Sequence, residues 1–311
     1  MNFLNLQYFC VAAEELSFTK AAKRLFISQQ SLSNHISRLE EEFGVALFNR
    51  TQPVTLTQAG ECLYRNSQIL LYQKNQTEKA IQDIRDFRSG ELTIGASTSR
   101  SAVMLADVLP QFHQKFPQIQ LRLVEGTTKL INQALYEGRT DVNIGFAIND
   151  PDTVEEELLH KEHLVCVVPN VLLPGSQPPE PDTLIPGSMQ NFRCFARFPF
   201  VRMHRESWLG SVFEQCCQDH QVSPKVVLET TSMTTLVSLC SVGMGAIVLP
   251  EIFVNRRAAF WNHSDWQMSV SVFPLDYPRG VTPITISRLK GHYLSRAAIE
   301  FIHMAKQKFT Y

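Results

Sequence analysis

Apolar positions follow three different patterns along this chain, and each pattern predicts a different kind of structure. Near the N-terminus they recur at steps of four, three and four, which is typical of an amphipathic helix. The clearest such stripe consists of Leu32, Ile36, Leu39 and Phe43. The opposite side carries uncharged amides and a hydroxyl, namely Gln30, Asn34 and Ser37. Such groups can pair with DNA base edges or phosphates.

A shorter helix is predicted just before this one, over residues 18–25. Its small Ala21 and Ala22 would let a second helix cross closely. A short helix, a tight turn and a polar-faced second helix describe a helix-turn-helix. An ordinary pair of helices with a polar outer face fits the same pattern. Beyond Gly44, a candidate helix C-cap, residues 45–50 and 51–57 predict two short extended segments around a turn, where a winged helix-turn-helix has its wing.

Residues 1–60 resemble the N-terminal module of the LysR-type transcriptional regulators. The residues that carry this resemblance are Leu6, Phe9, Ala12, Ser17, Phe18, Ala21, Ala22, Leu25, Ser28, Gln29, Ser33, Ile36, Leu39, Glu40, Gly44, Leu47, Phe48, Arg50, Leu56, Thr57, Ala59 and Gly60. Gln30 stands where the family usually has Pro or another small residue, and Asn34 where it often has Arg. Both amides suit adenine, which predicts an unusual operator sequence.

Contacts with double-stranded promoter or operator DNA are expected from one set of residues within and just after the helix-turn-helix, which spans residues 18–37. The set is Ser28, Gln29, Gln30, Ser33, Asn34, Arg38 and Arg50. Gln29, Gln30 and Asn34 are expected to touch bases, and Ser33, Arg38 and Arg50 to hold mainly phosphates. Residues 1–60 contain five basic and five acidic residues, and the whole chain has net charge −1. DNA affinity would therefore need dimerisation and a local basic face.

One long helix is predicted over residues 58–88, because Thr57 can cap its start and neither Gly nor Pro interrupts residues 61–88. A heptad repeat runs along it through Leu63, Leu70, Thr77 and Ile84, with Ala80 and Phe87 at alternate positions. About 28 residues make a rod of roughly 42 Å, and a narrow apolar seam favours pairing with the same helix of a second subunit. Packing on the chain's own body is the alternative. The family resemblance implies dimers that associate into tetramers, and residues 89–90 are expected to form a hinge after this linker, residues 61–89.

From residue 91 the pattern alternates between strand and helix, which predicts an α/β fold with parallel sheets and helices on their faces. Strands are expected at 92–95, 119–124, 141–146, 164–168, 225–228, 246–249, 268–273 and 282–287, and helices at 102–116, 130–137, 208–219, 233–242 and 293–308. The plan resembles the family's effector-binding domain, residues 90–311, which is like a two-lobed periplasmic binding protein. Lobe 1 would comprise about 90–163 and 274–311, and lobe 2 about 164–273. The Pro-rich stretch 169–186 is expected to be a surface loop.

A small-molecule effector is expected between the lobes, because ligands of open sheets bind beyond the carboxyl ends of the strands. Hydroxyls follow two predicted strands there and lead into helices: Ser97, Thr98, Ser99 and Thr128. Plain helix N-capping is the alternative and would be preferred for a single cluster, but two clusters that converge on one cleft favour an anion. The resemblance implies further lining residues: Phe146, Met203, His204, Thr231 and Ser232. A small organic anion is therefore the expected effector.

Enzyme activity is not expected, and no catalytic residue, metal site or cofactor is predicted. The segment 243–248, with glycines at 243 and 245, lies between a helix and a strand, the wrong order for a dinucleotide loop. His160 and His163 are expected to be solvated rather than metal ligands. The seven cysteines are odd in number and show no CxxC spacing, so thiols are expected; a redox pair of Cys194 with Cys216 or Cys217 is the minor alternative.

No secretory signal or membrane span is evident, so a cytoplasmic location is expected. Two functions remain. The first is a transcriptional regulator controlled by an effector. The second is a solute-binding or carrier protein whose N-terminal helices serve only for assembly. The amides on the helix favour the first, since assembly alone would not need them.

Overall fold

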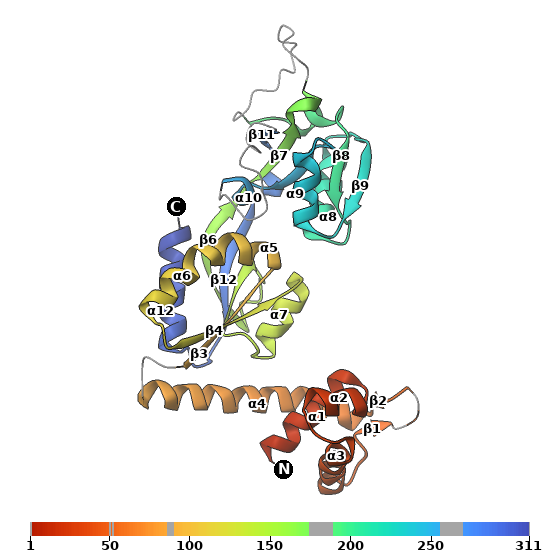
Figure 1. The fold of residues 1–311 in the computed structure, drawn as a ribbon, viewed down its shortest axis with the longest axis vertical. Helices are drawn as coiled ribbons and strands as arrows, with labels where there is room; N and C mark the ends of the chain where they lie inside the picture. Colours follow the sequence, from red (N-terminus) through yellow and green to blue (C-terminus); the bar gives the residue numbers. More distant parts are fainter. Residues whose placement is uncertain are drawn as a thin grey trace.

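The computed structural model describes residues 2–49, 51, 53–85, 90–173, 189–255 and 270–310. Three units follow one another along the chain: a helical head, one long helix and a pair of lobes (Figure 1). No helix among these residues is long and apolar enough to cross a membrane.

The head contains the predicted helix-turn-helix and a minimal wing. Its elements are α1 (Phe3–Glu15), α2 (Phe18–Arg24), α3 (Gln29–Phe43), β1 (Phe48–Asn49) and β2 (Thr55–Leu56), and the two strands pair antiparallel. Leu32, Ile36 and Leu39 are fully buried, as their spacing predicts. Phe43 is 43% exposed, so its place in the buried stripe was wrong, because it ends the helix beyond the head core. Gly44 follows in the left-handed conformation and confirms the C-cap.

The long helix α4 (Gln58–Arg85) begins where the sequence predicts. The Oγ1 atom of Thr57 accepts a hydrogen bond of 3.0 Å from the Gly60 N–H and caps it. The first half of α4 packs on the head, where Leu63 is half-buried against the head core. Further along the helix, the Tyr72 side chain is buried among residues of lobe 1. The alternative of a helix packed on its own chain is therefore confirmed for this face.

Another face of α4 remains exposed and apolar. Leu70 and Ile81 expose 40% and 61% of their surface. Leu70 belongs to the predicted heptad seam, whereas Leu63 is used inside the head. The side chains of residues 84 and 87, also assigned to the seam, lie outside the described part of the chain, as does Ser89 of the predicted hinge.

Lobe 1 is built on a five-stranded sheet of order β4-β3-β5-β12-β6. Its strands are β3 (Gly90–Ala96), β4 (Ile119–Glu125), β5 (Val142–Phe146), β6 (Val154–Glu162) and β12 (Thr282–Leu289). Its helices are α5 (Thr98–Arg100), a π-helical turn (Ser101–Leu105), α6 (Ala106–Lys115), α7 (Thr128–Tyr136) and α12 (Arg296–Phe309). α6 and α12 lie side by side on one face, and α7 covers the other (Figure 1).

Lobe 2 has two small sheets, β10-β7-β11 and β8-β9. Its strands are β7 (Leu164–Pro169), β8 (Phe200–Met203), β9 (Val226–Thr230), β10 (Ile247–Pro250) and β11 (Val270–Pro274). Its helices are α8 (Trp208–Asp219), α9 (Met233–Ser241) and α10 (Ile252–Asn255), and short 3-10 turns cover Asn170–Leu172 and Phe192–Phe195, with a further one at Pro278–Gly280 after the lobe. Phe200 bridges to Ala246 and joins the two sheets.

The expectation of parallel sheets is only partly correct. β3 is parallel to β4 and β5, and β8 to β9, but β12 is antiparallel to both its neighbours and β7 is antiparallel to β10 and β11. The reason is the double crossing between lobes: a strand entering a lobe and a strand leaving it run in opposite directions.

Smaller differences concern single elements. The strand β6 was not predicted, and the C-terminal helix begins at Arg296 rather than 293, because Ser295 caps it. The helix after β3 begins at Thr98, before the predicted position. Pro169 ends β7 instead of lying in a loop, and residues 174–186 of the Pro-rich stretch lie outside the described residues.

Candidate DNA interface and effector site

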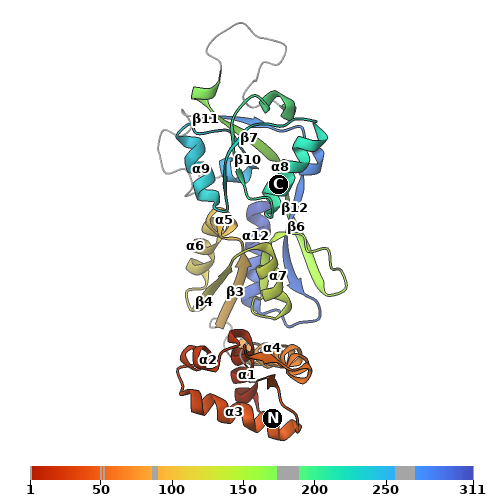
Figure 2. The ribbon, with the colours of Figure 1, turned by 90° about the vertical axis from the view of Figure 1, so that its right-hand side faces the viewer.

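One face of α3 presents the residues predicted to read DNA. Gln29, Gln30, Asn34 and Arg38 are exposed, and Ser33 is half-buried. Ser28 is the N-cap, and its hydroxyl accepts a hydrogen bond of 3.1 Å from the Ser31 N–H. Figure 2 shows α3 on the side of the head that faces away from both lobes. This face is therefore clear of the chain's own effector region, whereas Arg50 lies outside the described residues.

The α3 helix is held firmly by its buried side and by both neighbours. The Nδ1 atom of His35 lies 2.7 Å from the Asn5 Oδ1, and the Tyr8 ring packs edge-on against the His35 ring at 4.8 Å. At the other end, the Glu40 carboxylate accepts a hydrogen bond of 2.8 Å from the Leu47 N–H and ties the helix to the wing. Rigid support of this kind keeps a reading helix at a fixed angle.

Two features of the helix-turn-helix have no counterpart in the sequence reasoning. Thr19 of α2 donates a 3.0 Å hydrogen bond to the Oε1 of Gln29, which leaves the Gln29 amide nitrogen directed to other acceptors. Phe26, in the turn between α2 and α3, has φ +55° and is 95% exposed. A phenylalanine within a helical region is normally expected to be buried, so no feature of the sequence indicates that Phe26 is exposed.

The hydroxyl cluster of the predicted effector site lies at the carboxyl end of β3. Ser97 caps α5 by accepting from the Arg100 N–H at 3.3 Å, and its hydroxyl lies 3.4 Å from that of Ser99. Thr98 is exposed between them. In the second cluster the cap of α7 is Thr127, which accepts from the Leu130 N–H at 3.3 Å. Thr128, the predicted residue, is the exposed first residue of that helix.

The remaining predicted residues lie at the ends of neighbouring elements. Phe146 ends β5 in lobe 1, and Met203 ends β8 in lobe 2, where both are half-buried. His204 is exposed. Thr231 and Ser232 are exposed before α9, and Ser232 caps that helix by accepting from the Thr235 N–H at 3.2 Å.

A buried ion pair beside the hydroxyl cluster escaped the sequence reasoning. The Arg100 guanidinium donates to both Glu162 carboxylate oxygens, at 2.6 and 2.8 Å. Both side chains expose 5% or less of their surface. Burial opposes ionisation of Glu162, but the charge of Arg100 and its hydrogen bonds outweigh it and lower the pKa of Glu162. A glutamate at the end of an unpredicted strand gave no signal in the sequence.

A contact between two aromatic rings, next to the Arg100–Glu162 pair, joins the two lobes. The Arg100 guanidinium lies 4.8 Å from the centre of the Phe146 ring, and the Phe146 ring lies 4.6 Å from that of Trp208 at the start of α8. The structure thus places Phe146 against lobe 2, in contact with a tryptophan that sequence reasoning did not assign to the site.

His160 was expected to be solvated, and that expectation is wrong. Its side chain is buried on β6, and its Nε2 lies 3.6 Å from the Glu162 carboxylate. His163, on the loop that follows, is exposed as expected.

Asn143, a buried polar residue of β5, donates to the Ile131 carbonyl at 2.9 Å and accepts from the Thr140 hydroxyl at 2.7 Å. These bonds hold α7 against the lobe 1 sheet.

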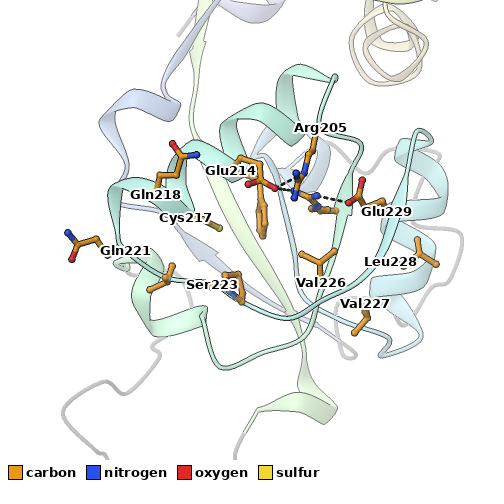
Figure 3. A pocket seen from close by; sticks show the side chains of 14 residues that line it. Arg205, Glu214, Cys217, Gln218, Gln221, Ser223, Val226, Val227, Leu228 and Glu229 are labelled. Atoms are coloured by element: carbon orange, nitrogen blue, oxygen red, sulfur yellow. Dashed lines mark hydrogen bonds and ion pairs between the residues drawn. The ribbon is translucent and has the colours of Figure 1, made fainter.

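A groove of about 780 Å³ lies between α8 and β9 in lobe 2 (Figure 3). Arg202 lies at its base and is bonded to Glu214 and, at 2.5 Å, to Glu229. Arg205 approaches Glu214 at 3.2 Å. Two arginines and two glutamates balance in charge, so this groove offers no net attraction to an anion. It contains none of the nine predicted effector residues.

The cysteines give little support to a redox role. All seven are free thiols. Burial is the main cause that raises the pKa of Cys216 to about 12 and that of Cys217 to about 11. Thiolates are the reactive form, so both side chains would be almost fully protonated and inert near neutral pH.

Comparisons with known proteins agree with this architecture. The description "Bacterial regulatory helix-turn-helix protein, lysR family" matches residues 3–61, and "LysR substrate binding domain" matches residues 85–310. The transcriptional regulator AlsR of Bacillus subtilis is 31% identical over 254 residues, which cover 81% of each chain. A full-length OxyR variant from Pseudomonas aeruginosa has a TM-score of 0.66 at 21% identity, covering 99% of this chain and 94% of that one.

The regulator CbnR, solved in full length with its target DNA, has a TM-score of 0.64 at 18% identity, with 99% of each chain covered. The family matches along both regions and the identity to AlsR disfavour an enzyme, and they disfavour a carrier whose head serves only for assembly. The chain belongs to the LysR family of DNA-binding transcriptional regulators, with a helix-turn-helix region followed by an effector-binding region.

Proposed function

We propose that this regulator reads its operator through Gln29, Gln30 and Asn34, while Ser28, Ser33, Arg38 and Arg50 contact phosphates. The observation that carries the proposal is the exposed polar face of α3, directly opposite the buried Leu32. Amides can donate and accept at once, which matches the edge of adenine in the major groove. With its Oε1 bonded to Thr19, Gln29 acts chiefly as a donor toward base acceptors.

The protein acts in the cytoplasm as a dimer that associates into tetramers, with residues 1–60 as the DNA-binding domain, 61–89 as the linker and 90–311 as the effector domain. Support for pairing comes from the exposed Leu70 and Ile81, which share one face of α4. An apolar stripe on a long helix is favourable to bury against a copy of itself. Pairing also compensates for the neutral charge of the head, because two heads double the phosphate contacts.

The effector is a small organic anion that binds between the lobes. Ser97, Thr98, Ser99 and Thr128 donate to its charged end, and Phe146, Met203, His204, Thr231 and Ser232 surround the remainder. Support comes from the hydroxyl pair at the end of β3 and from the aromatic face of Phe146. Trp208 lies on Phe146 in this structure, so a ligand with an apolar body would compete with that ring.

The DNA assignment is tested by comparing Asn34→Ala with Arg38→Ala. Asn34→Ala should cost about 1–3 kcal/mol on the operator and relax its base preference, because a base contact is lost. Arg38→Ala should weaken operator and random DNA alike and reduce the salt dependence by about one phosphate. Footprinting upstream of its own gene identifies the operator, and fluorescence anisotropy on that DNA gives the affinities. Unchanged operator preference in Asn34→Ala would remove Asn34 from the reading face.

The effector assignment is tested by thermal-shift screening with metabolites that carry carboxylate, sulfate or phosphate groups. A ligand that stabilises the wild type should lose most of its effect in Thr98→Val and in Thr128→Val, since each change removes one donor. Thr234→Val, on the exposed side of α9 in lobe 2, is the matched control and should leave the shift intact. A stabilising ligand that is unaffected by the first two changes would place the pocket elsewhere.

A further inference from the structure

The linker helix α4 inserts one aromatic side chain into lobe 1 of its own chain. Tyr72 is only 9% exposed and forms a separate small apolar cluster with Leu135, Val154 and Leu289. Its ring centre lies 4.7 Å from that of His292. Burial raises the pKa of Tyr72, as expected for a phenol removed from water. A residue of the linker is therefore part of an effector-lobe core.

We call the cluster of Tyr72 with Leu135, Val154 and Leu289 the Tyr72 seat. Gly138 lies directly against the Tyr72 ring in this seat. It follows α7, adopts φ +67°, and a Cβ atom built on it would lie 1.6 Å from a carbon of the Tyr72 ring. No side chain larger than hydrogen fits while the ring is in place. Two separate demands thus require glycine here: the left-handed backbone and the close approach of a ring from another unit.

The seat continues along the same side of α4. Arg65, Gln68 and Ile69 face α7 across a groove of about 560 Å³, and Gln76, one turn beyond Tyr72, is buried. Positions 65, 68, 69, 72 and 76 are separated by three or four residues and so share one helix side. Lobe 1 therefore packs on the linker at the Tyr72 ring and faces the same side of α4 across the groove.

The helix α7 connects this seat with the proposed effector site. Its first residue is Thr128, and its last turn contributes Leu135 to the Tyr72 cluster, just before Gly138. Nine helical residues span only about 13 Å. Asn143 bonds α7 to the sheet at Ile131, so helix and sheet move as one body. A change at one end of α7 is thus felt at the other.

We propose that the Tyr72 seat is a docking joint through which lobe 1 fixes the direction of α4 and thereby the spacing of the DNA-binding heads. The surface comprises the side of α4 around Tyr72 and the end of α7 at Gly138, and its occupant is the chain's own linker. Transmission from the effector rests on the proposed function, but the joint itself does not. An effector that shifts α7 would loosen or tighten the seat and so move the heads relative to each other.

The test uses the full-length protein without ligand, so it does not depend on the effector assignment. Gly138→Ala puts a methyl group into the ring, and Tyr72→Ala removes the ring. Gly291→Ala is the matched control, because Gly291 has the same φ of +67° but nothing within 4 Å of an added Cβ. Tyr72→Phe is the second control, since it keeps the ring. Circular dichroism verifies that each variant is folded.

Hydrogen exchange followed by mass spectrometry should show faster exchange, by roughly tenfold, around residue 72 and residues 135–138 in Gly138→Ala and Tyr72→Ala. Both controls should match the wild type. DNase I footprints on the upstream DNA should change in length or spacing only in the first two variants. Exchange in Gly138→Ala and Tyr72→Ala equal to that in Gly291→Ala would overturn the seat. Faster exchange with an unchanged footprint would overturn its coupling to the heads.

Discussion

Each lobe contains an arginine held by glutamates, and the two clusters differ in their contact with water. In lobe 1, Arg100 and Glu162 form a pair with 5% and 1% of their side chains exposed, and the buried His160 lies 3.6 Å from Glu162. In lobe 2, Arg202 is equally buried, but Glu214 and Glu229 expose 33% and 39%. The first cluster is sealed beneath the Phe146–Trp208 contact, and the second opens into a surface groove (Figure 3).

The difference shows that similar chemistry serves different ends in the two lobes. Sealing both charges of a pair costs desolvation that their attraction only partly returns, so apolar residues would stabilise the site of Arg100 and Glu162 equally well. The position of the pair fits a role at the junction of the lobes, where movement of Trp208 would admit water to it. The carboxylates around Arg202 stay partly hydrated, and their main effect is to neutralise the arginine.

The largest effect is expected from Arg100→Met, which leaves the Glu162 carboxylate buried without its guanidinium. Breaking a buried pair costs about 3–5 kcal/mol, which lowers Tm by roughly 10 °C for a domain of this size. All three tryptophans lie beyond residue 200, so their fluorescence during urea or thermal unfolding reports on the effector region alone.

The double variant Arg100→Met with Glu162→Leu is the control for this loss. It removes both charges and replaces them with apolar side chains of similar size, so most of the stability should return. If the double variant were as unstable as the single one, the loss would come from packing around Arg100 rather than from the unpaired carboxylate.

Acidification should remove the stability that the ionised Glu162 contributes. The pKa of Glu162 in the folded protein is lowered from its ordinary value of about 4.5. A depressed carboxyl pKa contributes stability that is complete above 4.5 and is lost as pH falls through the folded value. Because the double variant lacks this carboxyl, Tm of the wild type should fall relative to that of the double variant below about pH 4.5. A constant difference in Tm from about pH 7 to about pH 3 would show that Glu162 does not titrate in this way.

The DNA-binding head could be predicted from sequence because its signals are local. Leu32, Ile36 and Leu39 are three or four residues apart, and Gly44 ends their helix by a backbone preference of glycine alone. Such features depend on neighbours in the chain. Phe43 fits the helical spacing but is exposed. Burial at the end of a helix depends on whether another part of the protein lies opposite it, and the spacing of apolar residues does not give that information.

The effector region was predicted less completely because its decisive contacts are distant in sequence. Arg100 and Glu162 are 62 residues apart, and Phe146 meets Trp208 across the junction of the lobes. The hydroxyls of Ser97 and Ser232 were located correctly at helix starts, where both act as caps. The predicted parallel pairing was wrong for β7 and β11 of lobe 2, which are antiparallel. These two strands belong to the segments that cross between the lobes, and strand propensity does not reveal such crossings.

The smallest effect is expected from Glu214→Gln in the solvated cluster. Arg202 keeps its bond to Glu229, and a partly exposed ion pair contributes at most about 1 kcal/mol. Tm should therefore fall by less than about 4 °C, and raising NaCl from about 50 mM to about 0.5 M should shrink even this difference through screening. The loss in Arg100→Met should persist in the same salt, because ions do not reach that pair. A loss in Glu214→Gln as large as that in Arg100→Met, and equally insensitive to salt, would mean that access of water does not distinguish the two clusters.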